Sequence, residues 1–507
     1  MSDILQISTE KFDARFPNVN QTKRCWQNYF DYTKCVAAKG EDYAPCKQFL
    51  KAYTTLCPNE WIMSLRFELA SATSAPRRGK LVLDRLVGGD VVAERPAIML
   101  ETPAFFKYTR HGLQPHLVPE VAAEVEALPP ATRVQLEDFL DSDTSDCSQF
   151  EEGLHKFIAL DTAEILMLDT MDPTISVRTA KPTNAYMAIG SDGGIRRLTP
   201  SLFAQLANSL KPDIAIPPAD IVEEPLPSLT QGKRISKSVT RSAKWLDECM
   251  AALTHPAAVF APVVGSHSLE LRTIAAKALA ARHDIAGYAF NDVCLTLPLE
   301  YKLQLVQHSL ELLDASKPRY MLGASAPDAV LRAVLSGIDL FDSTYPYAVT
   351  EQGLASTYVL GVDDPTSLLP HSLDLWQEAM FADFGPLVKG CTCFTCRGHH
   401  RSYIHHLLKT KEMLATVLLQ IHNMHWYQRF FDDIRRSVDR GSLATDAALF
   451  FQRYGCEELP SSTSEQNKQA GRPFSELDTL AAQLCSPTTK IQRKRHAESQ
   501  AIAAELA

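Results

Sequence analysis

Cys391-Thr392-Cys393-Phe394-Thr395-Cys396 places three thiols within six residues, and His422 follows 26 residues after the last of them. Such closely spaced thiols make a poor disulfide framework, because a bridge between residues two positions apart strains the Cα separation. Three thiolates and one imidazole, by contrast, complete the tetrahedral shell of a structural Zn²⁺ site. The stretch therefore predicts one zinc ion, held by these three cysteines and a histidine.

The segment after the cysteines is predicted to supply the fourth ligand. Apolar residues recur at helical spacing from Leu407 to Ile421, which predicts one continuous helix over residues 403–438. A histidine on this helix can close the shell around the thiols. Spacing alone allows His422, and it also allows His405, His406 or His425.

The cysteine pattern and its distant histidine resemble the zinc site of the tRNA-guanine transglycosylases, in which His422 is the matching position. The flanking sequences resemble that family too, with Gly385-Pro386-Leu387-Val388-Lys389-Gly390 before the cysteines and Arg401-Ser402-Tyr403-Ile404-His405-His406-Leu407-Leu408 after them. The resemblance covers residues 63–455. It implies an α/β fold, a (β/α)8 TIM-type barrel with a zinc-binding subdomain, and the ligand set Cys391, Cys393, Cys396 and His422.

The middle of the chain alternates between short apolar runs and amphipathic segments. Strands are predicted at residues 213–216, 257–264, 285–290, 319–323 and 338–341, and helices at residues 234–253, 269–281, 299–313 and 327–335. Such alternation with short loops favours a parallel sheet with crossover helices. The pattern alone does not separate a barrel from an open sheet. It places no strand within residues 63–160.

The N-terminal part contains two pairs of cysteines at helical spacing. Cys25 and Cys35 bracket nine residues, Cys46 and Cys57 bracket ten, and a glycine and a proline separate the pairs. An antiparallel helical hairpin would place Cys25 opposite Cys57 and Cys35 opposite Cys46. A module this small has too little core of its own, so two disulfides are predicted to hold it together.

The string Asp13-Ala14-Arg15-Phe16-Pro17-Asn18-Val19-Asn20-Gln21-Thr22-Lys23-Arg24-Cys25-Trp26-Gln27-Asn28-Tyr29 resembles cytochrome c oxidase subunit VIb. That family consists of twin-cysteine proteins of the mitochondrial intermembrane space. The resemblance covers residues 10–61, nearly the whole length of such a protein. Residues 58–63 then leave almost no linker between the two parts. The chain is therefore predicted to be a fused product of two reading frames, or one whose halves work separately.

Asp342 ends a predicted strand, where barrel enzymes carry their catalytic groups. Residues 319–342 resemble the approach to the transglycosylase nucleophile, and Asp342 matches that aspartate. The arginines of the family motif P-T-R-x-x-R are missing from residues 343–351, and residues 291–296 replace the loop G-G-L-A-V-G. The general-base motif D-S-G-G-[FY]-Q has no counterpart in this sequence. We therefore expect no catalytic residue in this chain.

The chain is acidic overall, with a net charge of −9 and a pI of about 5.9, so contacts with RNA must be local. Two basic groups could meet tRNA phosphates or be ordinary solvated faces: Lys233, Lys237, Arg241 and Lys244 on one helix, and Arg397, Arg401, Lys409 and Lys411 near the cysteines. No run of about 18 apolar residues exists, so no transmembrane segment is expected.

Four domains are predicted: a helical hairpin (1–61), a barrel (62–380), the zinc motif with its long helix (381–455) and a flexible tail (456–507). The resemblance implies a non-catalytic accessory subunit that forms a heterodimer with a catalytic queuine tRNA-ribosyltransferase subunit, binds tRNA and Zn²⁺, and supports guanine-to-queuine exchange at the wobble position. One alternative is a self-sufficient transglycosylase that uses Asp342. Another is a respiratory-chain structural subunit. The expected location is cytoplasmic, peripheral on the mitochondrial outer membrane, while the N-terminal module suggests the intermembrane space.

Overall fold

The computed structural model describes residues 22–39, 43–56, 63–70, 76–85, 97–125, 127–140, 153–161, 163–172, 174, 182–191, 194–222, 231–291, 299–361 and 370–454. Two compact units are present. One contains Met1–Ser64 and Leu83–Ala97, and the other contains Leu65–Val82 and Ile98–Ala507. The predicted tail, residues 456–507, lies outside the described residues. The predicted domain boundaries stay predictions.

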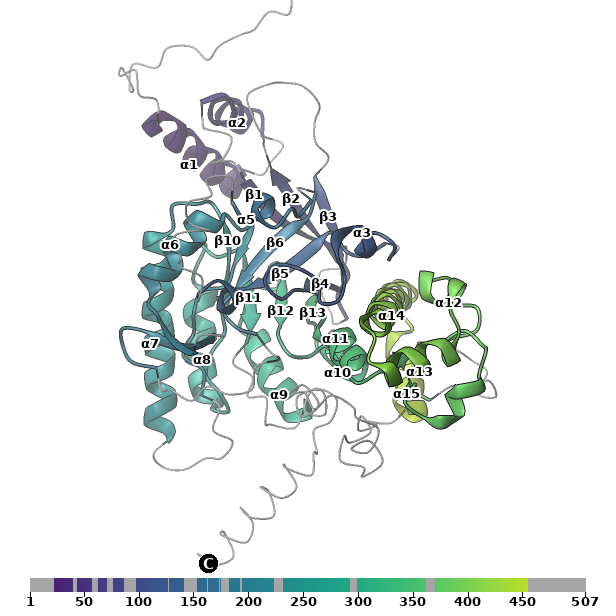
Figure 1. Cartoon of the computed structure of the whole chain (residues 1–507). Helices are drawn as coiled ribbons and strands as arrows, with labels where there is room; N and C mark the ends of the chain where they lie inside the picture. The colour runs from purple at the N-terminus through teal and green to yellow at the C-terminus, as the bar shows by residue number, and fades with distance from the viewer. Residues whose placement is uncertain are drawn as a thin grey trace, which may run out of the picture. The chain divides into compact units, whose positions relative to one another are not determined.

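Eight parallel strands close a barrel in the second unit, which confirms the predicted fold class (Figure 1). The closing pair joins the last strand to the first, with Asp342 in register with Phe106. In chain order the strands are β4 (Ala104–Tyr108), β5 (Ala131–Gln135), β6 (Ile165–Asp169), β9 (Ile214–Ala215), β10 (Ala258–Pro262), β11 (Gly287–Phe290), β12 (Arg319–Met321) and β13 (Leu340–Asp342).

Five helices surround these strands and bury apolar side chains such as Val306 and Val330 against them (Figure 1). They are α6 (Pro200–Leu210), α7 (Gln231–Ala252), α8 (Leu269–Ala280), α9 (Leu299–Leu310) and α10 (Pro327–Leu335). The helices predicted from apolar spacing match α7 to α10 closely. Helix α6 went unpredicted, although Thr199 caps it by accepting a hydrogen bond from the Leu202 amide, 3.1 Å away, and Pro200 opens its first turn.

The first two barrel strands were missed because a charged residue interrupts the apolar run of each, and β6 was also not predicted although its apolar run is uninterrupted. Strand β4 contains Lys107 and β5 contains Arg133, and both side chains are buried. Lys107 donates to Glu164 at 2.5 Å, so its charge is neutralised inside the protein. Lys107 and Arg133 are therefore charged strand residues that do not face solvent, because each has a partner inside the protein.

The remaining elements before α6 are short. A three-stranded sheet has the order β1 (Met63–Leu69), β2 (Gly79–Arg85) and β3 (Ile98–Thr102), and a hairpin joins β7 (Met187–Ser191) to β8 (Gly194–Leu198). Single helical turns occur at α3 (Pro119–Ala122), η2 (Leu136–Phe139) and α5 (Leu154–Phe157).

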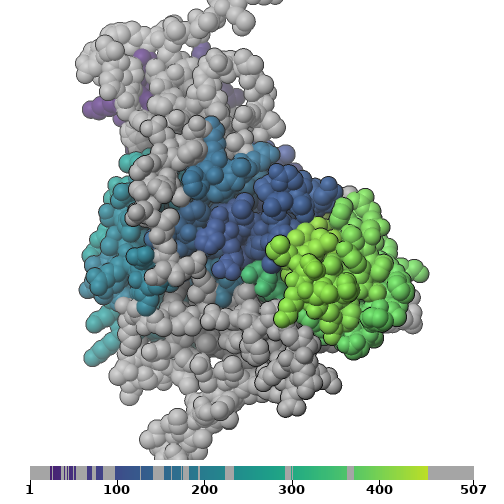
Figure 2. Space-filling model, in the orientation of Figure 1, coloured from purple at the N-terminus to yellow at the C-terminus, as the bar shows by residue number. Residues whose placement is uncertain are grey.

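A helical subdomain follows the barrel and forms the green lobe in Figure 2. Its elements are α11 (Thr344–Glu351), β14 (Leu354–Ser356), β15 (Ser372–Asp374), η4 (Glu378–Ala382), α12 (Phe394–Gly398), α13 (Arg401–Thr410), α14 (Met413–Arg440) and α15 (Leu443–Tyr454).

The single helix predicted over residues 403–438 is wrong, because the chain breaks between α13 and α14. Lys411 adopts a left-handed conformation with φ of 59°. The Glu412 amide donates to the Leu407 carbonyl and the Lys411 amide to the Leu408 carbonyl, which is the hydrogen-bond pattern of a Schellman motif. Glycine usually occupies the left-handed position of this motif, but here it is Lys411. The sequence therefore carries no glycine to mark the break, and the apolar spacing continues through it.

In the first unit, α1 (Thr22–Lys39) and α2 (Ala44–Leu56) form the predicted helical pair. Cys35 and Cys46 form a disulfide with their Cα atoms 5.6 Å apart. Cys25 is also disulfide-bonded, while its predicted partner, Cys57, lies outside the described residues. None of the helices in the described ranges is long and apolar enough to cross a membrane.

An ion pair closes the amino-terminal end of the barrel. Arg77, from the β1–β2 connection, lies 3.1 Å from Asp339, which immediately precedes β13, and both side chains are buried. Asp339 also accepts a hydrogen bond from the Arg319 amide at 2.9 Å. Burial raises the pKa of Asp339 to about 7, although Arg77 and Arg319 oppose this shift.

Removing the guanidinium while keeping its bulk should destabilise the barrel, because Asp339 would be left buried and unpaired. We expect Arg77→Met to lower the free energy of unfolding by about 3–5 kcal/mol at pH 7.5. A carboxyl with a raised folded-state pKa loses stability as pH rises from about 4 to 7, so this deficit should shrink at pH 5. Urea denaturation at both pH values measures it. The control is Lys80→Met, which removes an exposed partner 3.8 Å from Glu101 and should cost less than about 1 kcal/mol. Equal losses in the two variants would contradict the prediction.

Candidate metal centre and barrel mouth

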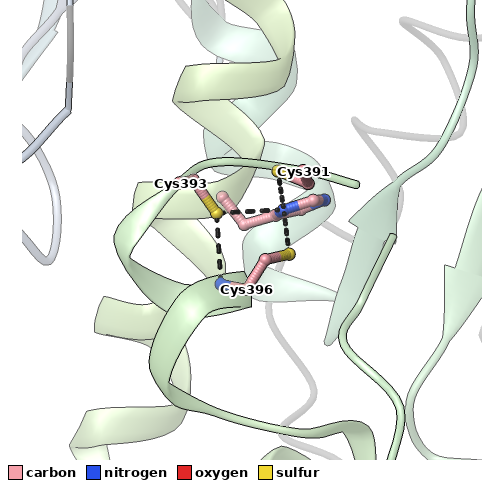
Figure 3. A group of neighbouring side chains, drawn as sticks. Cys391, Cys393 and Cys396 are labelled. Atoms are coloured by element: carbon pink, nitrogen blue, oxygen red, sulfur yellow. Dashed lines mark hydrogen bonds between the residues drawn. The ribbon is translucent and has the colours of Figure 1, made fainter. Parts of the chain in front are cut away.

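The structure brings Cys391, Cys393, Cys396 and His422 together. Cys391 lies in the loop before α12, Cys393 caps that helix, Cys396 is inside it, and His422 is on α14. Their ligand atoms all lie within 4.8 Å of one another. Figure 3 shows the three labelled cysteines converging from the loop and the short helix.

The spacing fits a tetrahedral zinc ion. Zn–S bonds of about 2.3 Å and Zn–N bonds of about 2.0 Å place sulfur and nitrogen about 3.5 Å apart at a tetrahedral angle. The His422 Nδ1 atom lies 3.9, 3.5 and 3.4 Å from the sulfur atoms of Cys391, Cys393 and Cys396. A Cys3His donor set with this geometry can hold Zn²⁺ with no coordination position left open.

The imidazole of His422 is fixed by its other nitrogen. Nε2 donates to the Ser356 carbonyl at 2.9 Å, so the lone pair of Nδ1 faces the thiols. The ring is fully buried and stacks on Trp426, with ring centroids 5.6 Å apart. The Cys396 amide donates to the Cys393 sulfur at 3.3 Å, which further orders the loop.

The other candidate histidines have different surroundings. His405 is buried and its Nδ1 bonds to the Leu375 carbonyl at 2.7 Å, whereas His406 is exposed. The thiol of Cys393 lowers the pKa of Cys391 to about 7, and smaller contributions come from His422 and His425. Among the described residues, His422 is the histidine whose ring nitrogen belongs to the cluster.

Helix α14 also attaches the cluster to the barrel. Asn423 accepts from the Ser356 amide at 2.8 Å and donates to the Leu354 carbonyl at 3.0 Å. The Tyr427 hydroxyl donates to the Ser325 carbonyl, 2.8 Å away, beside the end of β13. One helix thus carries the metal-site histidine and holds the strand end that carries Asp342.

Asp342 is fully buried at the carboxyl end of β13. One carboxylate oxygen accepts the Gly323 amide at 2.7 Å. The other accepts the Thr344 amide at 3.0 Å and the Thr344 hydroxyl. Both oxygens are therefore used to fix the turn into α11.

A second aspartate, Asp169, ends strand β6 and was not singled out from the sequence. Its carboxylate lies 3.2 Å from the guanidinium of Arg133, and Asn291 donates to it at 3.1 Å. Burial raises the pKa of Asp169, and Arg133 opposes the shift. The apolar run of residues 165–168 that ends in this acid could have revealed both the strand and the residue. Of the loop at residues 291–296, the structure describes Asn291 alone.

Nearby, Asp172 accepts the Tyr108 hydroxyl at 2.8 Å and the Thr174 amide at 2.7 Å. Asp342, Asp169 and Asp172 at the mouth of the barrel are therefore each held by partners from the protein itself.

The predicted basic groups are only partly available to a ligand. Arg241 pairs with buried Asp220, which also receives two bonds from Arg234 at 2.6 and 2.7 Å, and Lys244 lies 3.3 Å from Glu248. Arg401 holds the loop before the cysteines by donating to Asp383 and to the carbonyls of Pro386 and Leu387, and Lys409 pairs with Glu378. Lys233, Lys237, Arg397 and Lys411 are exposed.

Comparisons with known proteins support both sequence resemblances. A family model described as queuine tRNA-ribosyltransferase matches residues 74–455, and one described as cytochrome oxidase c subunit VIb matches residues 14–72. The chain is 31% identical over 422 residues to queuine tRNA-ribosyltransferase accessory subunit 2 of Xenopus laevis, an alignment that covers 76% of this chain and 99% of that protein. The corresponding protein of Homo sapiens is 29% identical over 381 residues, with 68% and 91% covered.

The cluster predicts one bound metal ion per chain, and its loss should unfold the surrounding subdomain because binding and folding are coupled. We expect elemental analysis to find about one equivalent of zinc in the purified chain, and Cys393→Ser to retain much less and to melt at a lower temperature. The control is His406→Ala, an exposed histidine on α13, which should keep the metal. If the wild-type chain contains no metal and melts at the same temperature with and without added zinc, the prediction is wrong. Full zinc retention in His422→Ala would also contradict it.

Proposed function

The chain belongs to the queuine tRNA-ribosyltransferase family, and from this premise we propose that it is a non-catalytic accessory subunit. In this proposal it pairs with a catalytic member of the family and supports the exchange of guanine for queuine in tRNA. The observation that carries the proposal is the state of Asp342. A nucleophile must present an oxygen lone pair to the carbon that it attacks. Both oxygens of Asp342 instead accept hydrogen bonds from Gly323 and Thr344 in a fully buried position.

Arg133 provides a second argument. Its guanidinium is fully buried inside the barrel and bonds to Asp169 and to the Met171 carbonyl. Asp169, at the end of β6, is thereby engaged by a cation from the neighbouring strand β5. An exchange reaction needs an open pocket with free acid and base groups. Because Asp169 and Asp342 are bonded to groups of the protein itself, we propose that the mouth of this barrel has a structural role.

The metal site fits a structural role in the same proposal. Four protein ligands leave no coordination position for water or substrate, which is the arrangement of structural rather than catalytic zinc. We propose that Zn²⁺ holds α12 against α14 and so fixes the outer surface of this subdomain.

That outer surface is rich in exposed aromatic residues and offers a place for the catalytic partner. Phe381 is 71% exposed, Phe384 73% and Met413 85%. The rings of Phe384 and His400 lie 5.2 Å apart, and those of His399 and Tyr403 stack at 5.4 Å. Large apolar side chains that remain exposed, such as Phe381 and Phe384, are typical of an interface between subunits.

A conservative change at Asp342 tests the catalytic part of the proposal. We expect Asp342→Asn, assayed together with the catalytic subunit, to keep base exchange within about threefold of wild type, because in this proposal the carboxylate takes no part in the chemistry. The new amide NH2 group must face the Gly323 amide or the Thr344 donors, so the variant should be less stable. A working nucleophile would lose a factor of about 10³ or more. Zinc content and dimer formation, measured on the same sample, show whether the variant is folded. A loss of that size in a folded heterodimer would contradict the proposal.

A charge on the aromatic surface tests the pairing. We expect Phe384→Glu to weaken the heterodimer about thirtyfold or more, because a buried anchor residue commonly contributes about 2 kcal/mol or more to binding. Analytical ultracentrifugation with the catalytic subunit measures the dissociation constant. The matched control is Phe157→Glu on α5, which is 45% exposed and lies outside this subdomain. If Phe384→Glu and Phe157→Glu bind the catalytic subunit with the same dissociation constant, Phe384 is not part of the interface.

A further inference from the structure

The outward face of α1 combines positive charge with an exposed aromatic ring. Phe30 and Lys34 follow Lys23 by seven and eleven residues, which places each of them within about 20° of Lys23 around the helix and all three within an arc of about 40°. All three are exposed, Phe30 by 42%. The Lys34 ammonium lies 4.2 Å from the centre of the Phe30 ring. Buried Cys25 and Asn28 lie on the other side of the same helix.

Helix α2 adds to this basic character. Lys47 and Lys51 are one turn apart and exposed, and Tyr43, just before the helix, is 47% exposed. The Cys35–Cys46 disulfide ties the end of α1 to the start of α2, so both sets of residues belong to one small unit.

The charges of the α1–α2 helical pair contrast with those of the whole chain. Residues 22–56 contain six basic and three acidic residues, whereas the whole chain has a net charge of −9. Within the described ranges, Lys23, Lys34 and Lys47 form no ion pair. On α7, by contrast, Arg241 and Lys244 are engaged by Asp220 and Glu248.

We infer that the outward face of α1, with Lys23, Phe30 and Lys34, binds the phosphates and an unpaired base of RNA, that Lys47 on the adjoining helix adds a phosphate contact, and that the chain thus has a tRNA contact outside its transglycosylase-like part. Lysines spaced along a helix can follow a phosphate backbone, and an exposed ring between them offers a stacking surface that accepts any base. That the RNA is tRNA rests on the proposed function. The charge and the aromatic ring themselves indicate only a flexible, anionic, base-bearing ligand.

The same lysines could meet the headgroups of an anionic membrane, but the face suits RNA better. A helix that lies in a membrane surface needs a broad apolar face beside its cations. Among the side chains of α1 that the structure describes, the outer face has one aromatic ring between two lysines, and the neighbouring Gln27 is bonded to Asp31 at 2.9 Å. These described residues offer stacking and charge without an apolar area wide enough to enter lipid.

The test measures binding of unfractionated, fluorescently labelled tRNA to the full chain by anisotropy at several salt concentrations. We expect Lys23→Gln/Lys34→Gln/Lys47→Gln to bind about tenfold more weakly at low salt and to reduce the log–log salt slope by about two, since each lost phosphate contact contributes about 0.7. Phe30→Ala should weaken binding at least about fivefold with little change in slope, because stacking does not release counterions.

The matched control removes three exposed cations that belong to neither predicted basic group, Lys80→Gln/Lys277→Gln/Arg436→Gln, and should change affinity and slope less. Retention of the Cys35–Cys46 disulfide, checked by mass spectrometry, shows that the variants keep their fold. Unchanged tRNA affinity in both Lys23/Lys34/Lys47 and Phe30 variants would overturn the inference. The inference would also be overturned if the lysine variant lost binding to anionic phospholipid vesicles and kept its affinity for tRNA.

Base exchange with the catalytic subunit separates this inference from the proposed function. If the wild-type chain supports exchange but the lysine variant binds tRNA normally, the further inference alone fails. If the wild-type chain does not support exchange, the proposed function fails, whatever the tRNA measurements show.

Discussion

The hydrogen bond from His422 Nε2 to the Ser356 carbonyl links the metal site to β14, the strand that follows α11 in the helical subdomain. It aims the other ring nitrogen at the three thiols and attaches α14 to β14 in the same contact. One residue further along, Asn423 pairs with both the amide of Ser356 and the carbonyl of Leu354. Because backbone groups of β14 would otherwise be buried without partners, the helix and the strand depend on each other. A metal ion at the cysteines would therefore stabilise the packing of β14 against α14 as well as its own loop.

Buried charges organise both ends of the barrel. Arg77 and Asp339 close the amino-terminal end, while Arg133 and Asp169 occupy the carboxyl-terminal mouth. A buried ion pair is costly to break, because removal of one partner leaves an uncompensated charge. At the mouth this constraint has a functional consequence. The carboxylates that could serve chemistry are engaged by the protein itself, which agrees with a subunit that supports a reaction carried out elsewhere.

The two units use cysteine in opposite ways. In the first, Cys35 and Cys46 form a disulfide, whereas the thiols of Cys391, Cys393 and Cys396 are free and close enough to bind a metal. Disulfides form under oxidising conditions, and metal-binding thiolates persist best under reducing ones. A single compartment does not suit both equally. The partners proposed for the two parts differ as well, with RNA at the outward face of α1 and a protein subunit at the exposed aromatic residues of the helical subdomain.

The sequence by itself determined the parts that depend on local spacing. The cysteine pattern predicted a metal cluster, the cysteine pairs predicted a disulfide-linked helical pair, and β–α alternation predicted a parallel sheet, because these follow from ligand count and periodicity. Barrel closure required the pairing of β13 with β4, more than 230 residues apart, which no local pattern contains. The roles of Arg133, Asp169 and Lys107 also emerged only in three dimensions. A charged residue in a strand reads as exposed until the opposite charge that neutralises it is found on a neighbouring strand or loop, and only the tertiary structure brings the two together.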